Sequence, residues 1–262
     1  MTMKLKEKIE AGQLVTGCFV NVYAPVAVEM LGRFGFDFLL LDQEHGCFSP
    51  GEMEHMMRAA DMVGLSTIVR VDYENSSVQK ALDMGAAGVQ IPMIRTAEDA
   101  RKAVSRAKYP PWGSRGVDLY SRAYRLGGFK DCAEYLNYQN RDTLVIAQIE
   151  TPEAAEYFEE IMGVPGIDLA FFGALDLSVN LGYLKGPGEE PVKEVLEGLY
   201  HRAEALSVPT GAVFLSGAIF AHAVSSGSRF LVTTLMGAMS AGFAQIMTPV
   251  IEYKTERNDK YD

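Results

Sequence analysis

Cysteine and positive charge are both scarce in this sequence. Its 262 residues include three widely spaced cysteines, Cys18, Cys47 and Cys132, and no Cys-x-x-Cys pair. This pattern suits reduced thiols in a cytoplasm, and it argues against a disulfide framework and a cysteine-based zinc site. Acidic residues outnumber basic ones by 34 to 24, so the net charge of −10 disfavours nucleic acid or an anionic membrane as a partner.

Long apolar runs and nucleotide-binding motifs are also missing. No stretch approaches the roughly 20 apolar residues that a membrane helix requires. The charged segment 1–13 lacks the apolar centre of a signal peptide, so we expect a soluble cytoplasmic protein. Neither G-x-x-x-x-G-K-[ST] nor a G-x-G-x-x-G after an expected strand occurs, which leaves nucleotide binding without its usual signature.

What is present is a regular alternation of two kinds of segment. Short β-branched or aromatic runs alternate with segments of helical spacing. Eight runs predict strands, at residues 16–21, 36–42, 66–71, 87–93, 143–150, 167–173, 210–215 and 229–235. They are apolar almost throughout, as expected for strands that helices bury on both faces. We therefore predict an α/β fold, a single (β/α)8 TIM barrel domain over residues 1–262.

Two regions stand outside this alternation. Residues 109–131 contain two prolines, four glycines and several aromatic residues, which predicts a long ordered loop. Loops of that length are usually functional, although a plain surface excursion is the alternative. Residues 238–251 have apolar residues at helical spacing and little charge. We expect a C-terminal helix that packs on, or is exchanged with, a neighbouring subunit of a homo-oligomer.

Ionisable and amide side chains collect where four of the predicted strands end. In a barrel of this type the strand C-termini and the following loops form the active site. The residues concerned are Asp42, Glu44, His45, Arg70, Gln148, Glu150 and Asp176. Each alone could cap a helix or complete an ion pair. Four polar strand ends facing one volume indicate a site, because unpaired buried charge is costly.

The side-chain types suggest a chemistry for this rim. Glu150 and Asp176, with no histidine or cysteine cluster nearby, suit a hard divalent cation, Mg²⁺ or Mn²⁺ with Co²⁺ as an alternative. His45 is the candidate for proton transfer, and Asp42 can fix its tautomer. Arg70 can stabilise a developing oxyanion. No lysine occurs in a predicted strand, which disfavours a Schiff-base aldolase.

The motifs in this order resemble those of the HpcH/HpaI aldolase family, the metal-dependent class II pyruvate aldolases. They are Asp-x-Glu-His at 42–45, Tyr-Pro-Pro-x-Gly-x-Arg-Gly at 109–116, Gln-Ile-Glu at 148–150 and Asp-Leu-Ser at 176–178. Any one motif alone would be unspecific, but together they cover nearly the whole chain. The resemblance implies a (β/α)8 barrel, usually a hexamer built from dimers that exchange their last helix.

The resemblance also implies a role for each matching residue. Glu150 and Asp176 would ligate the metal ion, and Arg70 would contact the keto oxygen of a small 2-oxo acid. His45 would act as the base through a water at the metal, with Asp42 orienting it.

Four further residues are expected around this centre. By the same resemblance, Gln148 would contact a water at the metal, and the backbone N–H groups of Gly173 and Leu175 would hold the substrate carboxylate. Adjacent residues of an extended chain face opposite sides, so Glu44 need not share the role of its neighbour His45. We expect Glu44 to support the waters at the metal.

The implied reaction is that of a carbon–carbon lyase. Such an aldolase reversibly cleaves a 4-hydroxy-2-oxo acid to pyruvate or a related 2-oxo acid plus an aldehyde, through a metal-stabilised enolate. The sequence departs from the family pattern in three places: residues 173–176 read Gly-Ala-Leu-Asp instead of Gly-Pro-Ala-Asp, residues 46–48 read Gly-Cys-Phe, and the eighth strand lacks its usual acid. An oxaloacetate-type decarboxylase, or an enolate-transfer enzyme similar to macrophomate synthase, is therefore an alternative. A catalytically silent barrel is the third possible interpretation of the sequence.

Overall fold

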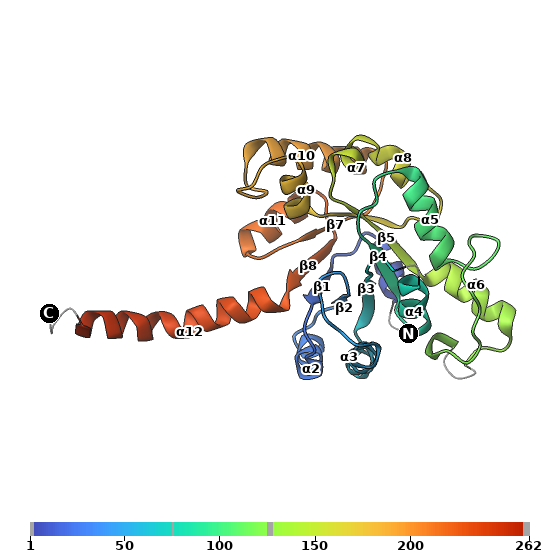
Figure 1. The fold of residues 1–262 in the computed structure, drawn as a ribbon, viewed down its shortest axis with the longest axis horizontal. Helices are drawn as coiled ribbons and strands as arrows, with labels where there is room; N and C mark the ends of the chain where they lie inside the picture. Colours follow the sequence, from blue (N-terminus) through green and yellow to red (C-terminus); the bar gives the residue numbers. More distant parts are fainter. Residues whose placement is uncertain (1–2, 75, 125–127, 259–262) are drawn as a thin grey trace.

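The computed structural model describes residues 3–74, 76–124 and 128–258. Parallel strands follow one another in chain order around a closed barrel, with β1 paired to both β2 and β8 (Figure 1). The strands are β1 Val15–Val20, β2 Phe38–Asp42, β3 Ser66–Arg70, β4 Gly88–Ile91, β5 Leu144–Ile149, β6 Leu169–Phe172, β7 Thr210–Val213 and β8 Phe230–Thr234. Each predicted run overlaps one strand, so the expected TIM barrel is confirmed.

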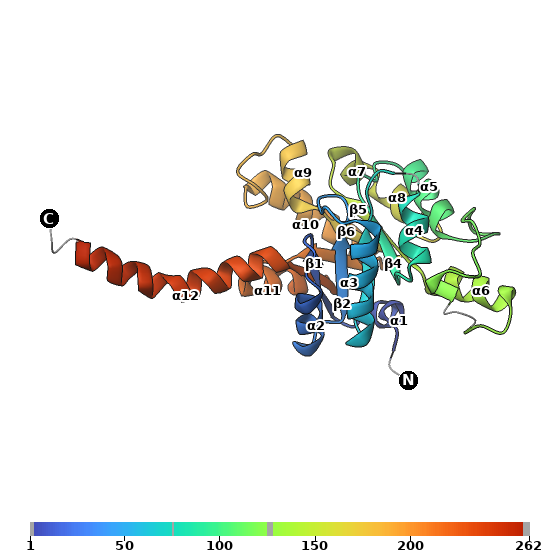
Figure 2. The same ribbon diagram turned by 60° about the horizontal axis from the view of Figure 1, so that its bottom comes forward.

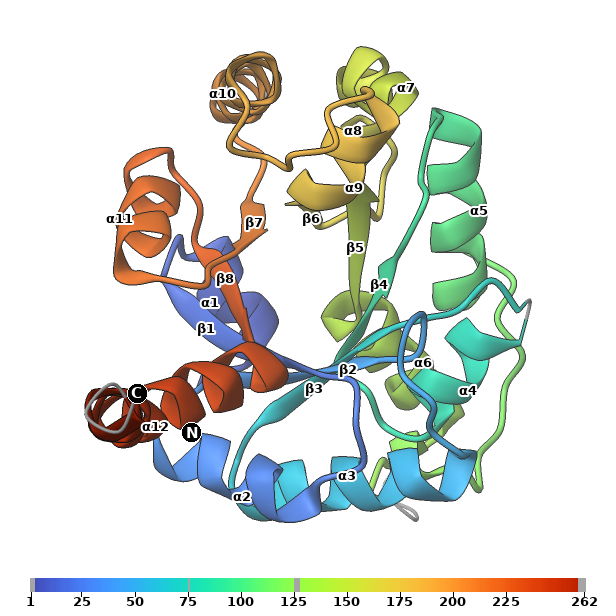
Figure 3. The ribbon, with the colours of Figure 1, turned by 60° about the vertical axis from the view of Figure 1, so that its left-hand side comes forward.

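Helices surround this barrel, as Figure 3 shows. They are α1 Leu5–Glu10, α2 Pro25–Arg33, α3 Pro50–Met62, α4 Ser77–Asp83, α5 Ala97–Ala107, α6 Cys132–Asp142, α7 Pro152–Glu156, α8 Phe158–Met162, α9 Ala174–Asn180, α10 Glu190–Ala205, α11 Gly217–Ser225 and α12 Leu235–Asn258, with a 3₁₀ turn η1 Arg122–Tyr124. The start of α3 is a capping box, in which Ser49 accepts from the Glu52 N–H and the Glu52 side chain accepts from the Ser49 N–H.

Aromatic rings and glycines fill the barrel interior at the end where the strands begin. The rings of Phe38 and Phe230 stack with centroids 4.2 Å apart. A Cβ added at Gly17 would lie 2.2 Å from the Phe38 ring, and one at Gly211 would lie 2.9 Å from the Phe171 ring. These glycines therefore make the room that the aromatic side chains occupy.

The same inward face turns polar at the end where the strands finish. Successive side chains of a strand point to opposite faces, so Asp42 shares the inner face with Leu40, and Arg70 shares it with Ile68. Leu40 and Ile68 are fully buried members of the interior apolar cluster. Gln148 follows Ile146 in the same way on β5. The two-residue alternation of the strands therefore points Asp42, Arg70 and Gln148 into the same space at the rim.

Helix α12 differs from the others because it extends away from the barrel (Figures 1 and 2). The predicted helix over residues 238–251 is confirmed within it. Its large exposed apolar side chains are Met236, Met239, Phe243, Ile246, Met247, Val250, Ile251 and Tyr253. In the part of the chain that the structure describes, no helix is both long and apolar enough to cross a membrane.

Candidate active site

A bidentate ion pair between Asp42 and Arg70 anchors the site. The two residues are partners on β2 and β3, and Arg70 donates from Nε to Oδ1 at 2.9 Å and from an Nη to Oδ2 at 2.7 Å. The guanidinium also lies 4.7 Å from the centroid of the Phe19 ring, at the top of the apolar interior. Burial alone would lower the pKa of Arg70, but the bond to Asp42 and the charges of Glu44 and Glu150 raise it. Arg70 is therefore a fixed positive charge.

The loop after β2 is folded around the Asp42 carboxylate. Oδ1 accepts from the backbone N–H groups of Glu44 at 3.2 Å and His45 at 3.3 Å. A Cβ at Gly46 would lie 2.1 Å from the Asp42 carbonyl oxygen, so this tight turn requires glycine. The His45 side chain is 62% exposed, and its Nε2 lies 3.9 Å from Oε2 of Glu44. Asp42 thus orients the backbone of His45, whereas the carboxylate beside the imidazole is that of Glu44.

Glu44 is more central than the sequence indicates. Its Oε2 lies 3.2 Å from an Arg70 nitrogen, and its Oε1 accepts from the Tyr73 hydroxyl at 2.7 Å. Burial and the bond to Glu44 both raise the pKa of Tyr73, so the phenol stays protonated and donating. Sequence reasoning missed Tyr73. Its place in the loop directly after β3, where barrel enzymes carry functional residues, is the signal that could have found it.

Glu150 is buried at the end of β5, and each of its oxygens has a donor. Oε1 accepts from the Met93 N–H at 2.6 Å, and Oε2 accepts from Nε2 of Gln148. Met93 has a φ of +54°, which is strained for a residue with a side chain and aims its N–H at the carboxylate. Met93 acts through its backbone, which is why no residue-type pattern could have revealed it.

The electrostatics of Glu150 favour a cation. Burial raises the pKa of Glu150, and the negative charges of Glu44 and Asp176 raise it further, against the bonds from Gln148 and Met93. Among the described residues no group of three or more His, Cys, Asp or Glu is placed to hold a metal ion. Two acids still fit a hard divalent cation that keeps several of its waters.

Asp176 lies in the first turn of α9 and is exposed. The neighbouring Gly173 differs from expectation, because its N–H donates to the Ile149 carbonyl at 3.0 Å and is already engaged. A Cβ at Gly173 would lie 2.8 Å from that of Glu150, so the glycine lets the acid sit close to β6. The N–H of Leu175, in the first helical turn, has no acceptor within the helix, and its side chain is 62% exposed.

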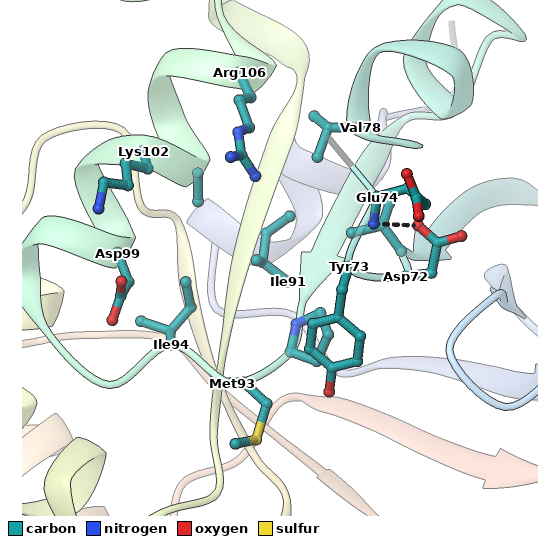
Figure 4. A pocket seen from close by; sticks show the side chains of 13 residues that line it. Asp72, Tyr73, Glu74, Val78, Ile91, Met93, Ile94, Asp99, Lys102 and Arg106 are labelled. Atoms are coloured by element: carbon teal, nitrogen blue, oxygen red, sulfur yellow. Dashed lines mark hydrogen bonds between the residues drawn. The ribbon is translucent and has the colours of Figure 1, made fainter. Parts of the chain in front are cut away.

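A cavity of about 230 Å³ lies behind the rim, between the loops that follow β3 and β4. In Figure 4, Lys102 and Arg106 lie on the α5 side of it, and Tyr73 and Met93 lie on the opposite side. These last two residues also hydrogen-bond Glu44 and Glu150 respectively, so the cavity adjoins the residues that hold the acids.

The loop 109–131 lies elsewhere. Its buried Arg115 pairs with Asp83 of α4 at 2.6 Å, and Tyr109 bonds Tyr135 of α6 at 3.1 Å, so these two residues anchor the loop to the surrounding helices. Residues 125–127 of this loop lie outside the described residues. The expectation that the loop is functional stays a prediction.

The comparisons with known proteins agree with this architecture. The family model described as HpcH/HpaI aldolase/citrate lyase matches residues 15–218. A hydroxypyruvate/pyruvate aldolase of Sagittula stellata is 30% identical over 237 residues, which cover 90% of this chain and 92% of the relative. A 2-dehydro-3,6-dideoxy-6-sulfogluconate aldolase of Pseudomonas putida is 38% identical over 186 residues, 71% of this chain and 72% of that protein.

A solved structure supports the same assignment. The crystal structure of an HpcH/HpaI aldolase from Desulfitobacterium hafniense DCB-2 superposes with a TM-score of 0.87 at 32% identity, covering 95% of this chain and 97% of that one. The sequence resemblance to this family is therefore confirmed. The chain belongs to the HpcH/HpaI aldolase/citrate lyase family and is a carbon–carbon lyase.

Proposed function

We propose that this lyase cleaves and forms 4-hydroxy-2-oxo acids, with pyruvate or a close analogue as one product and an aldehyde as the other. The family is generally dependent on a divalent metal, and here Mg²⁺ or Mn²⁺ is the proposed ion. The observation that carries the proposal is that a fixed guanidinium and a buried acid lie on the same rim of the barrel. Arg70 is held by Asp42, and Glu150 lies among the negative charges of Glu44 and Asp176.

Glu150 and Asp176 are the proposed ligands. A bound divalent cation would withdraw electron density from the carboxylate and ketone oxygens of the 2-oxo acid. Arg70 has five N–H donors and gives two of them to Asp42. The third guanidinium nitrogen lies 3.2 Å from Glu44, and the N–H groups that face neither acid are the proposed donors to the keto oxygen, where negative charge develops as the C–C bond breaks.

Proton transfer is assigned to His45. The imidazole is exposed at the rim, where its ring nitrogens can take and return a proton. Oε2 of Glu44 lies 3.9 Å from Nε2 of this ring. The free N–H of Leu175 is the proposed donor to the substrate carboxylate, and Gln148, beside Glu150, is the proposed contact for water at the site.

The test starts from protein stripped of metal by a chelator. Pyruvate release from a panel of 4-hydroxy-2-oxo acids should disappear and return with Mn²⁺ or Mg²⁺, whereas borohydride with pyruvate should leave the enzyme active because no Schiff base forms. Activity that survives exhaustive chelation would contradict the proposal.

Oxaloacetate decarboxylation is the second candidate, since it passes through the same enolate. The observation that favours it is the exposed Leu175 side chain, which stands beside the proposed carboxylate site where the family pattern has a smaller residue. Oxaloacetate belongs in the same substrate panel. Loss of oxaloacetate no faster than with the metal ion alone would remove this candidate.

We also propose that the chain forms a homo-oligomer through α12. The apolar side chains of this helix are exposed in a single chain, and contiguous apolar patches of this kind mark protein–protein contacts. Light scattering of the full chain should give a multiple of 28.7 kDa, with a hexamer as the expected state. Replacing Phe243 and Ile246 by Asp should shift it to smaller species. A monomeric wild-type chain would contradict this proposal.

A further inference from the structure

Gln90 is a polar residue in the barrel interior, next to the proposed site. It lies on β4, is completely buried, and is the strand partner of Arg70 on β3. Because partners in a parallel pair point to the same face, Gln90 belongs to the inward polar level of the rim. Its Nε2 donates to Oε1 of Gln148, while its own Oε1 has no partner among the described residues.

The direction of these amide bonds follows from the charge of Glu150. An ionised carboxylate only accepts hydrogen bonds, so Gln148 must present its NH₂ group to Glu150. The carbonyl of Gln148 then faces the other way and needs a donor, which Gln90 supplies. Reversing the Gln148 amide would place a carbonyl oxygen against the carboxylate. Gln90 therefore favours the one orientation of Gln148 that Glu150 can accept.

We propose that Gln90 is a positioning residue that acts through Gln148 to hold Glu150 ready for the divalent cation. The relay Gln90–Gln148–Glu150 fixes one carboxylate oxygen, and the Met93 N–H fixes the other. Hydrogen-bond partners of metal ligands preorganise a site, and losing one typically weakens affinity or activity 10- to 100-fold. The inference rests on the metal-dependent function proposed above.

The free Oε1 of Gln90 is consistent with this role. A buried acceptor without a donor is unfavourable, and native proteins keep few of them. Because the NH₂ group of Gln90 is turned toward Gln148, its carbonyl oxygen points the other way and forms the unpaired end of the relay. A glutamine that merely filled the core would be replaceable by leucine, because exchanging a polar group for an apolar one of similar shape is nearly neutral when no partner depends on it.

The first experiment measures Mn²⁺ affinity calorimetrically without substrate. Gln90→Leu should raise the Kd about tenfold, because the Gln148 amide loses the donor that fixes its orientation. The matched control is Gln139→Leu, which removes another buried glutamine, one that bonds Thr143 and Arg115 away from the site. The control should stay within about twofold of the wild type.

A double-variant cycle separates positioning from a general loss of packing. If Gln90 acts through Gln148, then Gln90→Leu should change the Kd by less than about twofold in a Gln148→Leu background. In kinetics, Gln90→Leu should raise the Mn²⁺ concentration needed for half-maximal rate more than it lowers kcat at saturating Mn²⁺. A wild-type Kd in Gln90→Leu, an equal loss in Gln139→Leu, or multiplying effects in the double variant would each overturn the inference.

Failure of the proposed function is distinguishable from failure of this inference. If the wild-type chain binds neither Mn²⁺ nor Mg²⁺, the metal-dependent function is wrong. The hydrogen bonds of the relay can then be tested separately, by NMR of the side-chain amide protons of Gln148. Their protection from solvent exchange should be lost in Gln90→Leu and kept in Gln139→Leu. Unchanged protection in Gln90→Leu would overturn the positioning role on its own.

Discussion

The two ends of the barrel interior use the same eight strands for opposite purposes. Where the strands begin, Phe38 and Phe230 stack in an apolar layer that glycines open to receive them. Two to four residues further along the same inward face, Asp42, Arg70 and Gln90 replace them. The first end is packed for stability. The second end holds charges and an unpaired acceptor that packing alone would not select.

Replacing Glu150 by Gln should give the largest separation between the two ends. Activity should fall on the order of 10³-fold, about 4 kcal/mol in the activation free energy, because one of the proposed ligands is lost. Stability without metal should rise instead, since the pKa of Glu150 is raised in the folded chain. An acid whose pKa is raised by folding lowers stability as pH increases from its ordinary pKa to the raised one, so the variant's gain should grow over that range and persist above it.

Urea unfolding of chelated protein at several pH values, with initial rates at saturating Mn²⁺, measures both effects. A Glu150→Gln variant that is less stable at neutral pH and also inactive would indicate that the acid supports the fold. It would contradict the assignment of stability to one end of the barrel and chemistry to the other.

Replacing His45 by Ala should lower turnover about 10²-fold and leave Mn²⁺ affinity within about twofold, because a general base contributes to proton transfer and not to ligation. Exchange of pyruvate methyl protons with D₂O, followed by NMR, measures the proton-transfer step. The exposed His222 on α11 offers a control, since His222→Ala should change neither quantity. A loss of metal affinity that matches the loss of turnover would mean that His45 is a ligand.

Replacing Phe38 by Leu probes the other end. The free energy of unfolding should fall by about 1.5 kcal/mol, because the stacked ring pair and part of the buried apolar volume are lost. The rate per folded molecule should not change. Phe34, which is 75% exposed, provides the control Phe34→Leu with little change in either quantity. A tenfold loss of kcat in Phe38→Leu would show that the two ends are not separable.

The sequence predicts the barrel and the rim for a physical reason. Strand periodicity and polar strand ends are local properties, so Asp42, Arg70, Gln148 and Glu150 could be placed on one rim without knowing any contact. What it cannot give is which partner each side chain chooses. The sequence predicts that Asp42 orients the His45 ring. In the structure the Asp42 side chain is instead paired with Arg70, a contact that depends on the register of β2 and β3.

Backbone donors escape sequence reading altogether. The Met93 N–H points at Glu150 because the φ angle of Met93 is positive. The Gly173 N–H donates to the Ile149 carbonyl because β5 and β6 are paired there. Neither fact changes a residue type. Side chains whose meaning depends on a neighbour, such as Gln90, look like ordinary members of an apolar strand until the adjoining strand is in place.

The smallest effect is expected at Tyr73, which lies at the edge of the polar end. Tyr73→Phe removes the hydroxyl that donates to Glu44, but Arg70 still holds that carboxylate, so kcat should fall only three- to tenfold, about 1 kcal/mol. Tyr120→Phe is the control, because that side chain is 92% exposed. The ratio of rates in H₂O and D₂O should change in Tyr73→Phe if Glu44 assists proton transfer at His45. An unchanged kcat would place Tyr73 outside the site and leave Arg70 as the sole described group that orients Glu44.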